Sequence, residues 1–225
     1  LEENSLSFDD FTGMLITHNH NDHIKGMRIL ASMFNIPVFA SAGTMDFLEE
    51  NGHVTSKFPF EVIDSKGIEA GDIFAFIGHN GAGKTTTLKC VAGIHDFEQG
   101  EIYMNGLSMK EDPLACKRQF AYIPDNPDLF DYLTGIQYLN FIADVFEVSD
   151  KDRQMRIEKY ANAFGIMESL GDLISSYSHG MKQKLAIISA LVHKPKLLIL
   201  DEPFVGLDPQ AAVVLKKTMH ELCEE

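Results

Sequence analysis

The chain has 225 residues, of which 45% are hydrophobic, and a formal net charge of -14 at pH 7. This length suits one sizeable hydrophobic core or two small ones, and the negative charge argues against binding to nucleic acid. The sequence has no apolar run near the roughly 18 residues of a membrane span and does not open with a signal peptide. Three scattered cysteines, Cys90, Cys116 and Cys223, fit free thiols in a reducing compartment. We therefore expect a cytoplasmic protein, at most peripheral to a membrane.

A run of metal-binding side chains follows the first predicted strand, residues 14–16. The candidate ligands are His18, His20, Asp22 and His23. Alternate side chains of a strand share a face, so His18 and His20 can reach one ion, while Asp22 and His23 on the next turn can reach a second. A solvated polar loop is the alternative. We favour the metal site because imidazoles seldom crowd in this way without an ion.

The letters THNHNDH resemble the HxHxDH loop of metallo-β-lactamase-fold hydrolases, and residues 1–69 resemble one stretch of that family. The resemblance implies a partial α/β segment with a zinc site. Each ion still needs donors from elsewhere in the chain. The remaining histidines do not lie in contexts like the later motifs of that family. We therefore expect an incomplete, vestigial zinc site.

A glycine-rich loop lies between a predicted strand and a predicted helix. The apolar run 73–77 is typical of a buried strand, and a helical pattern begins at Thr85. Between them, Gly78-x-x-x-x-Gly83-Lys84-Thr85 has the spacing of a phosphate-binding loop, whose backbone N–H groups surround an anion at a helix start. Lys84 can reach the β- and γ-phosphates of a nucleotide, and the Thr85 hydroxyl can bind Mg²⁺.

The middle of the chain carries predicted structural elements without a predicted site. The sequence predicts a short strand and turn at 100–106, and a strand leading into a proline-rich loop at 120–135. From residue 136 to about 173, apolar side chains recur at helical spacing. We expect the aromatic residues among them to pack a core rather than to bind a cofactor.

A second anion-binding element is predicted at Ser178. This residue precedes a helical pattern that Pro195 stops, and its hydroxyl is placed to cap the helix. Together with the Gly180 amide and the helix N-terminus, the hydroxyl would form an anion-binding site.

Two carboxylates follow the predicted strand 197–200. Asp201 and Glu202 stand at its carboxyl end, where ligands bind in parallel α/β sheets. One carboxylate beside Mg²⁺ and another free to polarise water are what hydrolysis of a phosphate anhydride needs. The alternative, a pair of solvated acids, is disfavoured by the phosphate-binding loop earlier in the chain.

Residues 71–225 resemble the ATP-binding subunit of an ABC transporter. GHNGAGKTT resembles the Walker A loop, YSHGM the signature motif, LLILDEP the Walker B strand and VGLDP the D-loop. The resemblance implies an α/β fold, with a P-loop NTPase core of the ABC type that has a parallel sheet and a helical subdomain. We place this ATP-binding domain at residues 70–225 and the partial metallo-β-lactamase-like segment at residues 1–69.

The resemblance also assigns roles to single residues. Asp201 and Thr85 would support Mg²⁺, and Glu202 would be the general base. Asp125 stands where many members have the Q-loop glutamine and would orient water or bind Mg²⁺, although it adds negative charge beside the phosphates. Ser178 and Gly180 would contact the γ-phosphate of ATP on a second subunit. The residues expected to hold the nucleotide and its metal are Gly78, Asn80, Gly81, Ala82, Gly83, Lys84, Thr85, Thr86, Asp201, Ser178, Gly180 and Asp208.

The implied function is Mg²⁺-dependent binding and hydrolysis of ATP, coupled to membrane transport and more typical of an export system. The expected cofactors are ATP and Mg²⁺, with Zn²⁺ at the incomplete site. The expected partners are a transmembrane permease subunit and a second ATP-binding subunit, identical or different, and not nucleic acid. We expect the protein to lie in the cytoplasm, on the inner face of the cell membrane.

Two other functions stay open. One is a metal-dependent hydrolase of the metallo-β-lactamase fold, and the other is a non-transport ATPase or an inactive ATP-binding module, because a fold does not fix a function. The two resemblances meet near residues 67–76, so we expect a chimera or a fragment in which the ATP-binding domain is truncated at both ends. ATP turnover would then be weak or absent, since the adenine-stacking aromatic residue and the switch histidine of the family have no counterpart in this sequence.

Overall fold

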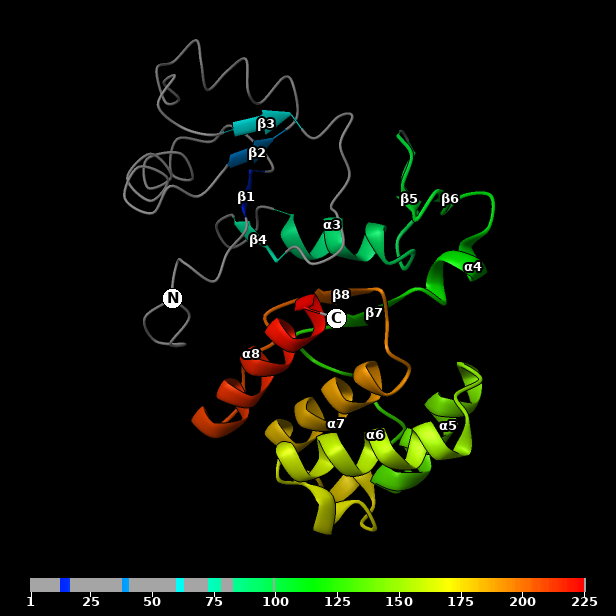
Figure 1. Cartoon of the computed structure of the whole chain (residues 1–225), viewed down its shortest axis with the longest axis vertical. Helices are drawn as coiled ribbons and strands as arrows, with labels where there is room; N and C mark the ends of the chain where they lie inside the picture. The colour runs from blue at the N-terminus through cyan, green and yellow to red at the C-terminus, as the bar shows by residue number, and fades with distance from the viewer. Residues whose placement is uncertain are drawn as a thin grey trace. The chain divides into compact units, whose positions relative to one another are not determined.

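In the computed structural model, the chain forms two compact units. The first contains residues 1–87 and 218–225, and the second contains residues 88–217. The residues it describes are 13–16, 38–40, 60–62, 73–77, 83–98 and 100–224. Figure 1 shows the whole chain, with the helices and strands labelled. Among the described residues, no helix is long and apolar enough to cross a membrane.

The first unit contains a parallel sheet of four short strands. They are β1 (Gly13–Ile16), β2 (Val38–Ala40), β3 (Phe60–Val62) and β4 (Phe74–Ile77), in the order β3-β2-β1-β4. Every neighbouring pair is parallel, and Met14 of β1 lies opposite Val38 of β2 and Ala75 of β4. The strands predicted at 14–16 and 73–77 are confirmed, and they are direct neighbours in this sheet.

Helix α3 (Lys84–Val91) begins directly after Gly83, the last glycine of the predicted phosphate-binding loop. Gly83 has a φ of 86°, a backbone conformation that favours glycine. Its carbonyl accepts a hydrogen bond of 2.8 Å from the Thr87 amide, which closes the first turn of the helix. The predicted change from loop to helix is confirmed at this point.

The second unit contains a hairpin and a pair of parallel strands. The hairpin joins β5 (Tyr103–Met104) to β6 (Leu107–Ser108) through Asn105 and Gly106, both of which have positive φ, as a tight hairpin turn requires. Strand β7 (Phe120–Ile123) pairs with β8 (Leu197–Leu200), and Tyr122 lies opposite Ile199. Helix α4 (Pro113–Lys117) precedes β7.

A compact hydrophobic cluster holds α3, the hairpin, α4 and the strand pair of the second unit together. Its buried members are Ala92, Met104, Met109, Cys116, Phe120 and Ile199. Partly buried side chains, including Leu88 and Tyr122, pack against them. One core therefore supports both the hairpin and the strands whose carboxyl ends carry the predicted site.

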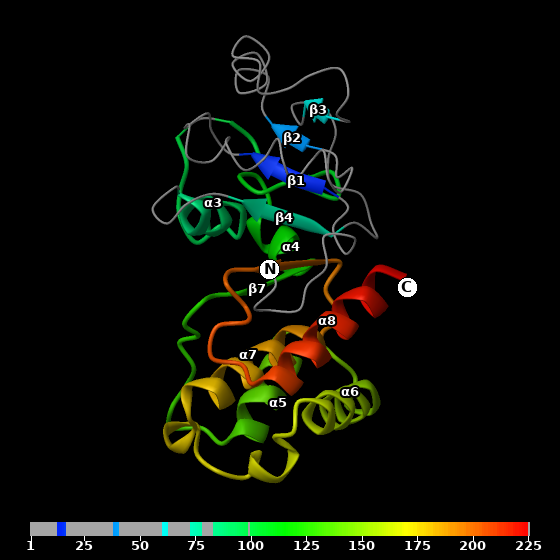
Figure 2. The same ribbon diagram turned by 90° about the vertical axis from the view of Figure 1, so that its left-hand side faces the viewer.

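Three helices form the other layer of the second unit: α5 (Gly135–Val145), α6 (Asp150–Ala163) and α7 (His179–Val192). Figures 1 and 2 show them packed together, and α7 contacts α5, α6 and β7. Short 3-10 turns η3 (Met167–Ser169) and η4 (Ile174–Ser176) lead from α6 towards α7. Because α7 is central, every residue from Leu185 to Val192 is buried.

The helix starts are fixed by local capping. Thr134 and Gln137 form a capping box at α5, and the Ser149 side chain caps α6. The last helix, α8 (Pro209–Glu224), follows the D-loop. The helical patterns expected from residue 136 onward are confirmed, and their apolar positions Leu139, Ile157 and others are buried.

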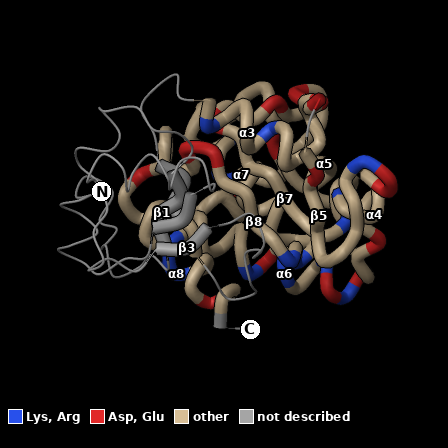
Figure 3. The backbone as a smooth tube through the Cα atoms, turned by 90° about the horizontal axis from the view of Figure 1, so that it is seen from above, with Lys and Arg blue, Asp and Glu red and all other residues tan. Residues whose placement is uncertain are grey.

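Acidic and basic residues are interspersed along the described part of the chain (Figure 3). Several of them form ion pairs within the second unit, such as Arg118 with Glu147 at 2.9 Å and Lys182 with Asp131 at 2.6 Å. The carboxylate of each pair is more than half exposed to solvent, so each pair contributes less than about 1 kcal/mol to stability.

Candidate nucleotide site

The phosphate-binding loop is described only at its carboxyl end. Gly78, Asn80, Gly81 and Ala82 lie outside the described residues. Lys84 and Thr85 are the first two residues of α3 and are partly buried, and Thr86 is exposed. The backbone N–H groups of a first helical turn have no partners within their own helix, so this end of α3 suits an anion.

Asp201 follows the last residue of β8, at the carboxyl end of the strand pair. Its side chain is among the buried charged groups of the protein, with 3% exposure. Its backbone amide donates to the Ile123 carbonyl at 2.9 Å, which continues the β7–β8 ladder by one residue. The Tyr122 hydroxyl donates to Asp201 Oδ2 at 3.3 Å. Hydrogen bonds therefore hold both the backbone amide and the carboxylate of Asp201, the residue predicted to support the metal.

The environment of Tyr122 keeps its hydroxyl protonated. Burial, followed by the negative charge of Asp201, raises the pKa of Tyr122 to about 12. The phenol consequently stays a hydrogen-bond donor throughout the neutral pH range.

Glu202 differs from its neighbour in exposure and in backbone conformation. Its side chain is exposed, and its φ of 47° lies in the left-handed region, which is unusual for a residue other than glycine. The Val205 amide donates to the Glu202 carbonyl at 3.1 Å and closes a turn there. Such a conformation costs about 1–3 kcal/mol and tends to occur at functional sites. The two adjacent carboxylates thus differ in exposure: Asp201 is buried and hydrogen-bonded, and Glu202 is open to water.

Asp125 lies in the loop that follows β7, and it is exposed. The carbonyl of the preceding residue, Pro124, accepts a hydrogen bond of 3.5 Å from Nε2 of Gln183 in α7. Gln183 is fully buried. The loop that carries Asp125 is therefore connected to the helix that begins with the predicted signature motif.

The signature segment forms the start of α7 as predicted. Ser178 is the N-cap of this helix, and its Oγ accepts a hydrogen bond of 3.3 Å from the Met181 amide. Both Ser178 and His179 are exposed. The predicted side-chain cap is confirmed, and the anion-binding role of this helix start stays a prediction.

Two glycines bring the D-loop segment against the signature segment. A Cβ added to Gly180 would lie 2.5 Å from the Gly206 carbonyl oxygen. A Cβ added to Gly206, whose φ is 78°, would lie 2.5 Å from Cδ2 of His179. Real Cβ atoms do not approach other atoms so closely, so both positions require glycine.

Asp208 joins the same two segments through its side chain. Oδ2 lies 2.6 Å from Lys184 Nζ in α7, and Oδ1 accepts a hydrogen bond of 2.8 Å from the Ala211 amide in the first turn of α8. The Lys184 hydrogen bond is the main cause that lowers the pKa of Asp208, and the Ala211 amide adds to it. Asp208 is thereby kept ionised, as a helix cap and as an ion-pair partner.

Within the second unit, the predicted residues form two groups. Asp201 and Glu202 follow β8, and Asp125 follows the neighbouring strand β7. Ser178 and Gly180 lie beside the D-loop segment that contains Asp208.

The sequence did not identify three residues that connect these predicted positions: Tyr122, Gln183 and Lys184. Of these three, only the position of Tyr122 could have been inferred from the sequence. Side chains alternate along a strand, so Tyr122 lies on the same face of β7 as Phe120.

The four predicted zinc ligands, His18, His20, Asp22 and His23, lie outside the described residues. In the part of the chain that the structure describes, no group of three or more metal-binding side chains occurs. Strand β1 ends at Ile16, two residues before His18, so the predicted strand before that loop is confirmed.

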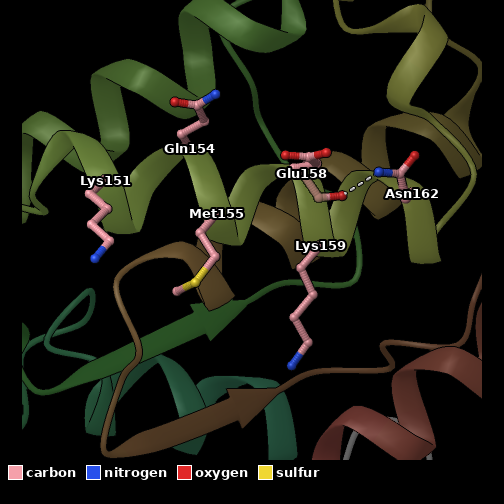
Figure 4. A pocket seen from close by; sticks show the side chains of 6 residues that line it. All are labelled: Lys151, Gln154, Met155, Glu158, Lys159 and Asn162. Atoms are coloured by element: carbon pink, nitrogen blue, oxygen red, sulfur yellow. Dashed lines mark hydrogen bonds between the residues drawn. The ribbon is translucent and has the colours of Figure 1, made fainter.

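A shallow depression lies on one exposed face of α6 (Figure 4). Its lining residues are Lys151, Gln154, Met155, Glu158, Lys159 and Asn162. The Asn162 side chain donates to the Glu158 carbonyl at 2.8 Å, one turn earlier. All six side chains come from one helix, and none of them belongs to a predicted motif. The depression is therefore distinct from the candidate nucleotide site.

A family model described as "ABC transporter" matches residues 64–205, more than half of the chain. The chain belongs to the ABC transporter family. The Walker A, signature and Walker B segments all lie within the matched range, and the D-loop, residues 205–209, begins at its last residue.

Individual members of the ABC transporter family show the same relationship. The chain is 38% identical over 154 residues to the ABC-type transporter ATP-binding protein EcsA of Bacillus subtilis, covering 68% of this chain and 62% of EcsA. It is 34% identical to the bacitracin transport ATP-binding protein BcrA of Bacillus licheniformis, covering 70% of this chain and 51% of BcrA. The chain thus spans between about half and less than two thirds of the length of these relatives.

A solved structure of the ATP-binding subunit of an ABC transporter supports the fold. It is 36% identical to this chain, with a TM-score of 0.68, and the alignment covers 71% of this chain and 66% of that one. The ABC-type P-loop NTPase fold expected from the motifs is confirmed.

Proposed function

We propose that this protein binds and hydrolyses ATP with Mg²⁺ as the nucleotide-binding subunit of an ABC transporter. The observation that carries the proposal is the pair of carboxylates after β8: Asp201 is buried and held by Tyr122, whereas Glu202 is exposed. Membership of the ABC transporter family supports the same assignment.

The chain offers the oxygen donors that Mg²⁺ prefers. Thr85 supplies a hydroxyl at the start of α3, and Asp201 supplies a carboxylate at the end of β8. When bound, Mg²⁺ would neutralise part of the charge on the β- and γ-phosphates. Lys84 and the backbone amides of residues 78–83 would bind the phosphates, since they occupy the positions of a phosphate-binding loop.

Glu202 would act as the general base. Its carboxylate is exposed and follows the metal-supporting Asp201 directly, so it can accept a proton from the attacking water while Asp201 keeps its own role. Asp125, exposed after the adjacent strand, would orient that water or bind Mg²⁺.

Ser178 and Gly180 would act on a second subunit. We infer a head-to-tail dimer, of identical or related subunits, in which the first turn of α7 contacts the γ-phosphate of ATP bound to the partner subunit. The exposure of Ser178 and His179 at the start of α7 supports this role.

Transport would require a transmembrane permease subunit, which would hold this protein in the cytoplasm against the inner face of the membrane. We favour export as the direction of transport, in line with the resemblance of residues 71–225 to the family. Co-purification of the chain with a tagged permease tests this association, and its absence would favour a non-transport ATPase.

A steady-state assay tests the proposed reaction. The expected result is Mg²⁺-dependent release of phosphate from ATP that Glu202→Gln abolishes, with Glu158→Gln as a control for the same change at an exposed glutamate of α6. Release that persists at the same rate in Glu202→Gln would refute the role of Glu202.

For the N-terminal segment, residues 1–69, we propose a partial metallo-β-lactamase-like segment with a vestigial zinc site at His18, His20, Asp22 and His23. The ligand spacing and the end of β1 just before the loop support this assignment. Metal analysis of the purified protein should find zinc well below one ion per chain. Stoichiometric zinc that is lost in His18→Ala would instead favour a metallo-hydrolase.

We also propose that residues 1–69 and 70–225 come from two families joined in one reading frame. The two adjoining sequence resemblances support this boundary. Sequencing of the encoding DNA across codons 60–80 tests the proposal, and the expected junction would be absent if the chain had a single origin.

A further inference from the structure

Tyr122 has two separate environments, one around its ring and one around its hydroxyl. The ring packs against the hydrophobic cluster that contains Phe120 and Ile199. The hydroxyl group instead donates a hydrogen bond of 3.3 Å to Asp201 Oδ2. A donor on a packed aromatic ring has little freedom, so the hydrogen bond restricts where the carboxylate can lie.

The two residues are also fixed relative to each other by their backbones. Ile123, which follows Tyr122, accepts a hydrogen bond of 2.9 Å from the Asp201 amide, and the two strands pair in parallel up to that point. Asp201 is 3% exposed, and a buried carboxylate is costly unless it accepts hydrogen bonds. The Tyr122 hydroxyl supplies such a bond from a rigid neighbouring strand.

We propose that Tyr122 is a positioning residue for Mg²⁺ binding, whose hydroxyl holds the Asp201 carboxylate in place before the metal and nucleotide arrive. The inference rests on the proposed role of Asp201. Groups that orient a metal ligand typically change metal affinity by about 10-fold to 100-fold when they are removed. At a donor–acceptor distance of 3.3 Å, we expect the lower end, about 10-fold.

The test uses the full chain and measures Mg²⁺ dependence rather than activity. In the parent and in Tyr122→Phe, the melting temperature is followed at saturating ATP while Mg²⁺ is titrated, and again with ATP and EDTA. Phe keeps the ring and removes only the hydroxyl. Tyr138→Phe is the matched control, because it also removes a phenol hydroxyl that is hydrogen-bonded, to the Ser189 side chain, and it lies outside the predicted motifs.

The expected result is a Mg²⁺ midpoint raised about 10-fold in Tyr122→Phe and unchanged in Tyr138→Phe, with the same ATP response in EDTA. A midpoint within twofold of the parent would overturn the proposal. A parent that shows no response to Mg²⁺ and ATP would instead refute the proposed function, and this inference with it.

A second measurement applies without nucleotide. The urea midpoints of Tyr122→Phe, Asp201→Asn and the double variant should be non-additive, because both single changes disturb one hydrogen bond. Additive effects would contradict the proposal. Tyr122→Met, which also lacks the hydroxyl, replaces Tyr122→Phe in both experiments if the latter does not fold.

Discussion

Lys184 and Asp208 form an ion pair of 2.6 Å between the helix of the signature motif and the D-loop. The other carboxylate oxygen of Asp208 accepts a hydrogen bond from the Ala211 amide in the first turn of α8. A single aspartate therefore links the signature helix to the start of α8. The approach of Gly180 to Gly206 brings the same segments together from the backbone side.

The double role of Asp208 predicts a graded series of variants. Asp208→Ala loses both the cap and the ion pair and should lower the free energy of unfolding by about 1–2 kcal/mol. Asp208→Asn keeps a capping oxygen and should cost less than about 1 kcal/mol, as should Lys184→Met. Urea unfolding measures each value. The double variant Asp208→Asn with Lys184→Met should be no worse than either single one, and additive losses would show that the ion pair contributes nothing.

Gly206 should tolerate no side chain. Gly206→Ala would place a Cβ 2.5 Å from the His179 ring at a φ that disfavours alanine, so we expect a loss of about 1–3 kcal/mol in unfolding free energy. Gly171→Ala is the control, because its Cβ would meet open space and its φ is not positive, and we expect a change within about 0.5 kcal/mol. Equal effects at the two glycines would contradict the close approach of the D-loop segment.

His193 should make stability depend on pH. Its ring stacks on Phe146 with centroids 3.7 Å apart, and burial, with the positive charge of Arg156 as a further cause, lowers its pKa below the usual 6.5. The folded protein therefore favours the neutral ring. The unfolded chain begins to take up the proton as pH falls through about 6.5, so the stabilisation present above that pH is lost as pH falls towards the folded pKa.

The pH effect can be measured from urea midpoints at pH 7.5 and 5.5. His193→Phe keeps a ring for stacking but cannot titrate, so its midpoint should fall less than that of the parent on acidification. His95→Gln, a change at an exposed histidine, should retain the full fall of the parent. If His193→Phe and the parent lose equal stability, the buried ring does not control this pH range.

The elements that local sequence determines were predictable. The run LLIL forms β8 with the expected ends. An apolar run of this length, with polar residues on both sides, is too short for a typical helix and is typical of a buried strand. The start of α7 at the Ser178 cap also follows from neighbouring residues alone. The hairpin was only partly predicted: the sequence indicated the strand and turn, but β6 is too short to show a pattern.

The contacts within the site were less predictable, because they join residues far apart in the chain. Tyr122 and Asp201 are 79 positions apart, and no local pattern states which strand lies beside which. Lys184 lies among other basic residues of α7, and nothing in the sequence distinguishes it as the partner of Asp208. The motifs thus located the chemical groups, whereas the packing of β7, β8 and α7 determined which side chains support them.

Nucleotide binding through Lys84 is the most direct test of the proposed function. The melting temperature is measured with and without Mg²⁺ and ATP in the parent, in Lys84→Ala and in Lys89→Ala, which removes a lysine from the last turn of the same helix. A bound nucleotide at 100 times its dissociation constant adds about 2.7 kcal/mol to stability. The melting temperatures of the parent and Lys89→Ala should therefore rise clearly, whereas that of Lys84→Ala should not. An unchanged melting curve of the parent at millimolar nucleotide would contradict the proposed function.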